Sequence, residues 1–200
     1  METMFKIIVV YNINMYATTY QHVPVMSGEA AEYLQPAAGK VFVDCTLGGG
    51  GHAEKLKSQS PKAKIIGMDR DGEAIAAARE RLAGFDNIEY VHDNFSNLKR
   101  HVKEKVDGFL FDLGVSSYQI DAPARGFSLQ QDGPLDMRMD KGQGLTAADI
   151  LNHSGVEELE TIFRDLGEER FARRIARAVV SHLPVETTFQ LKAIVEKAIP

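Results

Sequence analysis

The central motif of the chain is Val41-Phe-Val-Asp44-Cys-Thr-Leu-Gly48-Gly-Gly-Gly51-His52, in which an apolar run passes directly into four glycines. The apolar residues predict a buried strand over residues 41–44, and the glycines predict a tight turn into a helix after Gly51. Glycine lets a backbone bend sharply and approach a ligand closely, and the start of a helix offers free N–H groups. Ligands of open parallel sheets bind in the crevice at this end of the strands. The motif therefore predicts a ligand-binding turn.

Short strands and helices alternate on both sides of this motif. Three further strands are expected, at residues 64–69, 88–91 and 106–112. Helix starts are expected at Ser27, for a helix to about Leu34, at Asp71, for a helix to about Leu82, and at Ser96. This alternation is typical of a parallel sheet with right-handed crossovers. The fold class is therefore α/β, with a four-stranded Rossmann-like sheet over residues 21–120.

The regions on either side of this sheet domain have a different character. Residues 1–20 form an extension in which Phe5 to Val10 are either an added edge strand or upstream sequence ahead of a natural start at Met15, and the second interpretation is favoured. Residues 115–145 lack a clean period, which is typical of functional or mobile loops. Helix-start patterns follow at Thr146-x-x-Asp149, Ser154-x-x-Glu157 and Thr187-x-x-Gln190. Residues 121–200 are therefore expected to form a loop and an inserted α-helical subdomain, with no strand before Pro200.

The composition is that of an ordinary globular protein. The 200 residues are 44% hydrophobic and 26% charged. The net charge of −5 argues against binding nucleic acid through bulk charge, but it leaves room for a local basic patch. The single cysteine, Cys45, excludes an internal disulfide and suits a reducing compartment. No apolar run approaches the roughly 20 residues of a membrane helix. A cytoplasmic protein without a membrane partner is therefore expected.

Aspartates end three of the predicted strands. Asp69 can accept hydrogen bonds from both ribose hydroxyls of a nucleoside. Asp44 precedes the glycines, where it would repel a pyrophosphate but attract the positive sulfur and amino group of a sulfonium cofactor. A buried carboxylate at Asp112 would need a ligand or a hydrogen-bond donor, and the alternative is a capping or loop-fixing acid. These three acids, together with the glycines, predict a nucleoside site.

Two interpretations stay open at this site. The spacing Gly48-x-Gly50-x-x-Ala53 also fits the dinucleotide fingerprint, so a nicotinamide-dependent oxidoreductase is the alternative to a sulfonium-dependent enzyme. Phe95 follows the third strand, where its ring either lies against an adenine or packs in the core. A titration with each cofactor separates the two functions.

Several distinctive blocks carry a resemblance to a known family. They are Asp112-Leu-Gly-Val-Ser-Ser117, Gln119-Ile-Asp121, Arg125-Gly-Phe-Ser128, Asp132-Gly-Pro-Leu-Asp-Met-Arg-Met-Asp140, His22-Val-Pro-Val25 and Gly167-Glu-Glu-Arg170. Taken in their order along the chain, from residue 22 to residue 170, they resemble the MraW-like bacterial methyltransferases that act on the N4 amine of a cytosine in small-subunit (16S) ribosomal RNA. The likeness extends from about residue 20 to the end of the chain.

The resemblance implies S-adenosyl-L-methionine as the cofactor and 16S rRNA or the small ribosomal subunit as the partner. Carried over onto this sequence, it implies cofactor contacts at Gly50, Gly51, His52, Asp69, Phe95, Asp112 and Gln119. His52 and Gln119 rest on the resemblance alone, whereas Asp44 comes from the residue pattern alone. Tyr118 stands where the family usually has proline, so the loop before Gln119 is expected to be less rigid.

The family's sequences also continue past Pro200 with further strands. A truncated chain is therefore expected, with an edge uncovered beside the strand at 106–112. A fragment that binds cofactor or RNA weakly, or does not fold, is a third hypothesis. A thermal melt with and without S-adenosylmethionine addresses it.

Asp112, helped by the carbonyls of Leu113 and Gly114, is the candidate for accepting hydrogen bonds from the target amine. Asp136 and Asp140 are weaker candidates, since hydrogen bonds to Arg125 or Arg138 are an equal alternative for them. No pattern of metal ligands is expected.

For RNA, one candidate is a helix face with Arg170, Arg173, Arg174 and Arg177 opposite an apolar side of Phe171, Ile175 and Val179. A solvated face paired with Glu168 and Glu169 is the preferred interpretation of these arginines. Arg125, Arg138 and Lys141 are alternative phosphate contacts.

Overall fold

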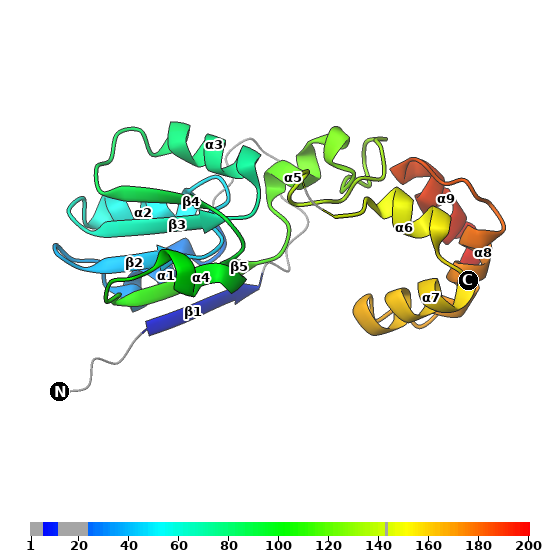
Figure 1. The fold of residues 1–200 in the computed structure, drawn as a ribbon, viewed down its shortest axis with the longest axis horizontal. Coiled ribbons are helices and arrows are strands. Elements are labelled where there is room, and N and C mark those ends of the chain that lie inside the picture. Colours follow the sequence, from blue (N-terminus) through cyan, green and yellow to red (C-terminus); the bar gives the residue numbers. More distant parts are fainter. Residues whose placement is uncertain (1–5, 12–23, 143) are drawn as a thin grey trace. The chain divides into compact units, whose positions relative to one another are not determined.

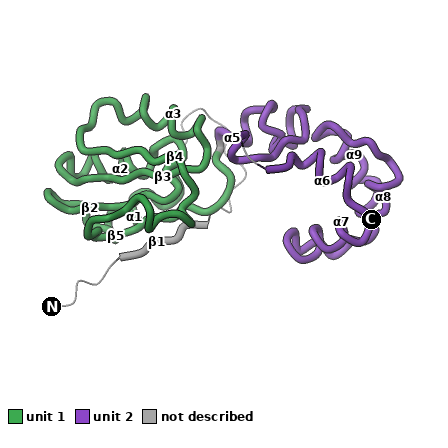
Figure 2. The backbone as a smooth tube through the Cα atoms, viewed as in Figure 1, with its two compact units in different colours: residues 1–116 green, residues 117–200 purple. Residues whose placement is uncertain are grey.

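The computed structural model describes residues 6–11, 24–142 and 144–200. The chain divides into two compact units, of which the first ends at Ser116 and the second runs from Ser117 to Pro200 (Figure 2). Phe5 and Met15, on which the two interpretations of the N-terminal extension depend, lie outside the described residues, as does the first half of the block at 22–25.

The first unit is built on a five-stranded, fully parallel sheet (Figure 1). In the spatial order β1-β5-β2-β3-β4, its strands are β1 Lys6–Tyr11, β5 Gly108–Leu113, β2 Val41–Asp44, β3 Lys64–Asp69 and β4 Ile88–His92. The predicted strands β2 and β3 are confirmed with their bounds. β4 extends one residue further than predicted, and β5 begins two residues later. The predicted α/β class and parallel pairing are therefore confirmed.

Strand β1 corrects the expected strand number. Its residues pair in parallel with β5, and Val10 is in register with Asp112. The apolar run near the N-terminus is thus an added edge strand, the alternative that was not favoured. It supplies backbone partners to the side of β5 that was expected to be uncovered, because a strand edge left open exposes its N–H and C=O groups.

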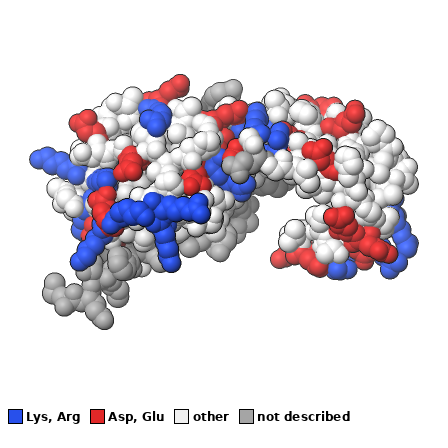
Figure 3. All heavy atoms as spheres, viewed as in Figure 1, with Lys and Arg blue, Asp and Glu red and all other residues white. Residues whose placement is uncertain are grey.

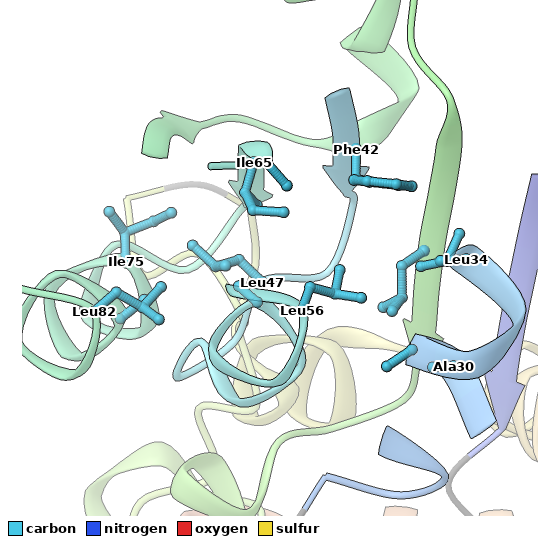
Figure 4. Packing of buried hydrophobic residues seen from close by; sticks show 13 residues of the cluster. Ala30, Leu34, Phe42, Leu47, Leu56, Ile65, Ile75 and Leu82 are labelled. Atoms are coloured by element: carbon cyan, nitrogen blue, oxygen red, sulfur yellow. The ribbon is translucent and has the colours of Figure 1, made fainter. Parts of the chain in front are cut away.

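One face of the sheet is covered by three helices, α1 Ser27–Leu34, α2 Gly51–Gln59 and α3 Gly72–Arg81. Figure 4 shows Phe42 of β2 and Ile65 of β3 lying on the same side as Leu56 of α2, and all three side chains are at most 1% exposed. Burying a side chain of this size contributes about 1.5–3 kcal/mol. This packing fixes α2, and with it the glycine turn, against the sheet.

The opposite face is covered by the segment between β4 and β5. It contains the short helices η1 Phe95–Asn97 and α4 Leu98–His101. Leu98, Val102 and Val106 from this segment pack against a cluster that includes Val43 and Ile66 of the sheet. The crossover thus carries the chain from the carboxyl end of β4 back to the start of β5.

The helices expected from Ser27, Asp71 and Ser96 are present, and one of the two predicted side-chain caps is confirmed. The Asp71 side chain accepts a hydrogen bond from the Glu73 N–H at 3.0 Å and caps α3. The cap predicted at Ser27 was wrong, because α1 begins after Met26, whose φ of 53° turns the chain into the helix without a side-chain cap. The short helix expected from Ser96 is confirmed and begins one residue earlier, at Phe95, where Asn94 caps η1 by accepting from the Ser96 N–H at 2.8 Å.

The described part of the second unit consists of helices, turns and an isolated bridge between Pro134 and Thr187. Its elements are α5 Ser117–Asp121, η2 Pro123–Arg125, α6 Ala147–His153, α7 Val156–Thr161, η3 Ile162–Leu166, α8 Ala172–Val180 and α9 Thr188–Ala198. The capping boxes at Thr146 and Thr187 are confirmed. The one expected from Ser154 is wrong, because α7 starts after Gly155 without a side-chain cap.

The long irregular segment of this unit is organised by a buried guanidinium. Arg125 is 1% exposed, and its Nη2 donates hydrogen bonds to the carbonyl oxygens of Arg138 at 3.0 Å and Met139 at 2.9 Å. A buried charge with such partners holds remote parts of a loop together, since losing them would leave it desolvated and unsatisfied. Arg125 is therefore a structural residue here.

Candidate functional site

Three carboxylates lie together at the carboxyl edge of the sheet, because β5, β2 and β3 are neighbours and each ends at or near an aspartate. Asp44 ends β2, Asp69 ends β3, and Asp112 is next to last in β5. Asp44 is in register with Gly67 of β3 and Leu110 of β5, so it lies two residues inward from the other two acids.

Asp44 is the most deeply buried of the three. It is 1% exposed, and its Oδ1 accepts a hydrogen bond from the Thr46 N–H at 3.2 Å. Its Oδ2 has no hydrogen-bond partner among the described residues. The pKa of this carboxyl is raised from 3.8 to about 7, chiefly by burial. The charge of His52 and the hydrogen bond from Thr46 oppose the shift, and the charges of Asp69 and Asp112 add to it.

The glycine turn follows directly from β2 and is fastened by Asp69. The turn stays attached to the sheet through Leu47, whose N–H donates to the Met68 carbonyl at 2.9 Å. Oδ2 of Asp69 then accepts from the Gly48 N–H at 2.7 Å, and Oδ1 accepts from the Asp71 N–H at 2.9 Å. Burial raises the pKa of Asp69, and these backbone hydrogen bonds oppose the shift. Asp69 thus sets the position of the turn.

The four glycines of the turn differ in how much room each would leave for a side chain. Gly50 has a φ of +81°, and a Cβ there would lie 3.0 Å from Leu82. A Cβ on Gly51 would lie 2.3 Å from the side chain of Pro24. Gly49 has nothing within 4 Å of such a Cβ. Packing therefore requires the second pair of glycines, while the first pair leaves the backbone open to a ligand.

Thr46 links two of the acids, which the sequence did not indicate. Its N–H donates to Asp44, and its Oγ1 accepts from the Asp112 N–H at 2.6 Å. A hydroxyl in a glycine-rich turn has many possible partners, and only the adjacency of β2 and β5 selects this one.

His52, the second residue of α2, lies beside Asp112. Its Nε2 is 3.4 Å from Oδ2 of Asp112, and the histidine is only 5% exposed. Neither ring nitrogen of His52 makes a hydrogen bond within the described part of the chain, and Oδ1 of Asp112 also has no partner there. Unsatisfied buried polar atoms are rare and point to a missing donor or acceptor. The site thus carries several polar atoms that are available to a ligand.

Phe95 opens η1 just after β4. Its ring packs edge to face on Phe111 of β5, with 5.5 Å between ring centroids and 89° between planes, and the residue stays 39% exposed. Phe111 directly precedes Asp112 in β5, so this contact places Phe95 near the carboxyl end of that strand. Packing accounts for one edge of the ring, and the exposed part is available for stacking.

Asp93 positions this aromatic ring and was not singled out from the sequence. It accepts from the Asn94 N–H at 2.7 Å and from Asn97 Nδ2 at 2.8 Å, and it lies 2.6 Å from His101 Nε2. The hydrogen bond from the Asn97 side chain, followed by that from His101, lowers the pKa of Asp93 to about 2. The Asp93 network therefore fixes η1 and α4 against each other.

Gln119 and the other loop residues belong to the second unit. Gln119 lies on α5 and is 4% exposed. Asp136 is a loop-fixing acid, because it accepts from Nε and Nη2 of Arg138 at 2.9 and 2.8 Å. Asp140 accepts from the Gly142 N–H at 2.9 Å. For Asp136, the structure supports the alternative role that the sequence left open.

The arginine face of the second unit is carried mainly by α8. Ile175 and Val179 are buried as predicted. Arg170 does not join this helix face, because α8 begins at Ala172. Its guanidinium instead lies 4.6 Å from the ring centroid of Phe171. Within the described residues, Arg173 approaches Glu160 at 3.7 Å, and no pair with Glu168 or Glu169 forms.

No three side chains of His, Cys, Asp or Glu among the described residues group so that they could hold a metal ion. None of the helices described is long and apolar enough to span a bilayer.

A parallel sheet with a glycine turn after β2 and acids at the ends of three adjacent strands defines the Rossmann-like class of α/β proteins. The model of the MraW methylase family matches residues 19–200. The chain belongs to the MraW methylase family.

Curated relatives are named ribosomal RNA small subunit methyltransferase H. The relative from Clostridium botulinum (strain Loch Maree / Type A3) is 47% identical over 189 residues, covering 90% of this chain and 61% of that protein. Those from Halothermothrix orenii and Syntrophotalea carbinolica are 47% and 48% identical, each covering 90% of this chain and 60% of its own length. The chain thus spans about three-fifths of the length of these relatives.

Proposed function

We propose that this chain carries the cofactor site of an enzyme that transfers a methyl group from S-adenosylmethionine to the N4 amine of a cytidine in 16S ribosomal RNA. The observation that carries the proposal is the pair of buried, unpartnered carboxylate oxygens, Oδ2 of Asp44 and Oδ1 of Asp112. They fit a ligand with positive charge and N–H donors, because such groups satisfy both oxygens. The pyrophosphate of a nicotinamide cofactor would meet negative charge here.

Each predicted contact has a chemical role toward this cofactor. When bound, S-adenosylmethionine supplies a methyl group on a positively charged sulfur. Asp44 balances positive charge, and Asp69 accepts from ribose hydroxyls with the lone pairs that its two backbone bonds leave. The exposed part of Phe95 offers a surface for adenine. The remaining proposed contacts are Gly50, Gly51, His52, Asp112 and Gln119.

Asp112 is the proposed catalytic residue. The amine of cytosine is a weak nucleophile, since its lone pair is delocalised into the ring. Oδ1 of Asp112 accepts a hydrogen bond from the amine, which localises the lone pair and prepares for loss of a proton. The carbonyls of Leu113 and Gly114 orient the same group. Productive transfer also requires a nucleophile held about 3–3.5 Å from the methyl carbon, with the target base splayed out of the RNA.

Calorimetric titration of the chain with S-adenosylmethionine, S-adenosylhomocysteine and NAD tests the cofactor assignment. Binding of the first two, and a Kd for NAD weaker by about a hundredfold or more, is expected from the charge argument. Tighter binding of NAD would reverse the proposal.

The catalytic assignment is tested by Asp112→Asn, with the exposed Asp86→Asn as the matched control. In a methyl-transfer assay with small-subunit RNA and the full-length protein, we expect a loss of about a hundredfold for Asp112→Asn only. Near-normal transfer would exclude an essential role for Asp112. The proposed partner is the small ribosomal subunit or its RNA, which places the protein in the cytoplasm.

A further inference from the structure

A strip of basic side chains lies on the crossover between β4 and β5. Its members are Lys99, Arg100, Lys103 and Lys105, and all four are exposed. Figure 3 shows basic side chains gathered in a band over this part of the first unit. On a protein with a net charge of −5, such a local concentration is unusual.

The charges of this basic strip are not neutralised within the described part of the chain. None of its four members forms an ion pair there, and Lys103 only donates from Nζ to the Lys99 carbonyl, at 2.8 Å. The acid within the strip, Glu104, is engaged by Lys64 from β3. The basic strip therefore projects uncompensated positive charge.

The basic strip is also held in place from beneath. Leu98, Val102 and Val106 of the same segment pack on the sheet, so the basic side chains face solvent. The hydrogen bonds from Asn97 and His101 to Asp93 fasten the start of α4. Cations on a fixed backbone lose less entropy on binding than cations on a mobile loop.

The position of the strip relates it to the candidate site. The segment starts near the carboxyl edge with Phe95, which contacts Phe111 beside Asp112, and the basic strip runs from there towards the start of β5, where Glu104 pairs with Lys64 at the start of β3. A long anionic polymer with one nucleotide at the carboxyl edge of the sheet can extend its flanking phosphates along this surface.

We propose that the basic strip binds backbone phosphates of the RNA that presents the target nucleotide, an inference that rests on the proposed function. Lysine and arginine contacts to phosphates position RNA without reading its sequence. A membrane surface fits less well, because Leu98, Val102 and Val106 face the sheet, so that no apolar side chain lies exposed among the four cations of residues 99–105 to enter a bilayer.

The arginine face of α8 is a weaker candidate for the same role. Helix α7, which packs against α8, carries Glu157, Glu158 and Glu160, and Arg173 approaches Glu160. Acidic neighbours reduce the attraction for phosphate. No acid other than the engaged Glu104 lies within the basic strip of the crossover.

The test compares Arg100→Ala/Lys105→Ala with Lys62→Ala/Lys197→Ala, which removes the same charge from two exposed lysines elsewhere. Binding of a fluorescein-labelled RNA hairpin with cytidines in its loop is measured from low to high salt, and S-adenosylhomocysteine binding is measured on the same samples. The strip variant should lower the slope of log K against log salt by about 1.4–1.8 and weaken binding at 0.1 M salt by about 10- to 50-fold. The control variant should match the parent chain.

Several outcomes overturn the inference. They are an unchanged slope in the strip variant, an equal loss in the control, no RNA binding by the parent chain, or equal binding to phosphatidylserine vesicles. Failure of the parent chain to bind S-adenosylhomocysteine would instead reject the proposed function. Intact cofactor binding in the strip variant also shows that it is folded.

Discussion

Replacing Asp44 by asparagine should make the fold more stable at pH 8 and weaken binding of the cofactor. Burial raises the pKa of the Asp44 carboxyl from 3.8 to about 7, whereas the unfolded chain keeps it near the ordinary value. Between these values the folded chain holds the proton more tightly than the unfolded chain. The stabilisation is therefore fully present below pH 4 and is lost as the pH rises towards 7.

The size of the effect follows from the two pKa values. A difference of about three units corresponds to about 4 kcal/mol once Asp44 is ionised in both states, and about 3 kcal/mol of it develops between pH 5 and pH 8. Asparagine keeps an oxygen for the Thr46 N–H and has no charge to bury. Any cost of burying the amide group is independent of pH, so it changes the free energy of unfolding by the same amount at pH 5 and at pH 8. The advantage of Asp44→Asn over the parent chain should thus grow by about 3 kcal/mol from pH 5 to pH 8.

Urea unfolding of both proteins at several pH values measures this growth directly, with Asp86→Asn as an exposed control. Calorimetry at pH 8 measures the cost to binding, where loss of a charged acceptor should weaken S-adenosylmethionine by about tenfold or more. Parallel stability curves from pH 5 to pH 8 would refute the argument that Asp44 is a buried carboxyl with a raised pKa. Unchanged cofactor affinity would leave the stability argument intact but remove Asp44 from the site.

Three further substitutions test the packing around the site and in the second unit. Gly51→Ala should destabilise the fold by about 1–3 kcal/mol in urea unfolding, because its Cβ has no room, whereas Gly49→Ala should have a smaller effect. Arg125→Ala should cost about 2–4 kcal/mol and raise hydrogen exchange across residues 123–142, since two partly buried carbonyl oxygens lose their donor. Thr187→Ala should lower stability by about 1 kcal/mol, while Ser154→Ala, which removes no cap, should stay within about 0.5 kcal/mol. Equal losses in a substitution and its control, or unchanged exchange for Arg125→Ala, would contradict the packing assigned here.

The central strands were predictable because each is buried on both faces. An apolar run such as residues 64–69, bounded by polar residues, leaves few alternatives, and Asp71 has the usual chemistry of a helix cap. The strand β1 could not be decided in this way. Its partner β5 lies about a hundred residues later in the chain, and pairing over such a separation leaves no local pattern. The cap expected at Ser27 is absent because a cap depends on backbone dihedral angles as well as residue type.

The acids of the candidate site were found because parallel strands end at one edge, so residues at strand ends share a location. The hydrogen bonds that hold these acids were not found. Thr46 joins β2 to β5, and Asp93 fastens α4, through contacts that exist only after the strands have been ordered in space. The strand ends therefore indicated the acids of the site, whereas Thr46 and Asp93, which position the neighbouring segments, had no pattern in the sequence that marks them.

Asp44 and Asp112 differ from other aspartates of the chain in their hydrogen bonds. Asp69 accepts two backbone N–H groups, Asp107 accepts from the Val41 N–H at 2.9 Å, and Asp136 accepts from the guanidinium of Arg138. Each of these acids is explained by what it holds in place. Asp44 and Asp112 instead keep a buried oxygen without a partner among the described residues, an arrangement that destabilises the fold. A group that only fixed a loop would gain nothing from this, so the site is best understood as one completed by a ligand that brings the missing donors.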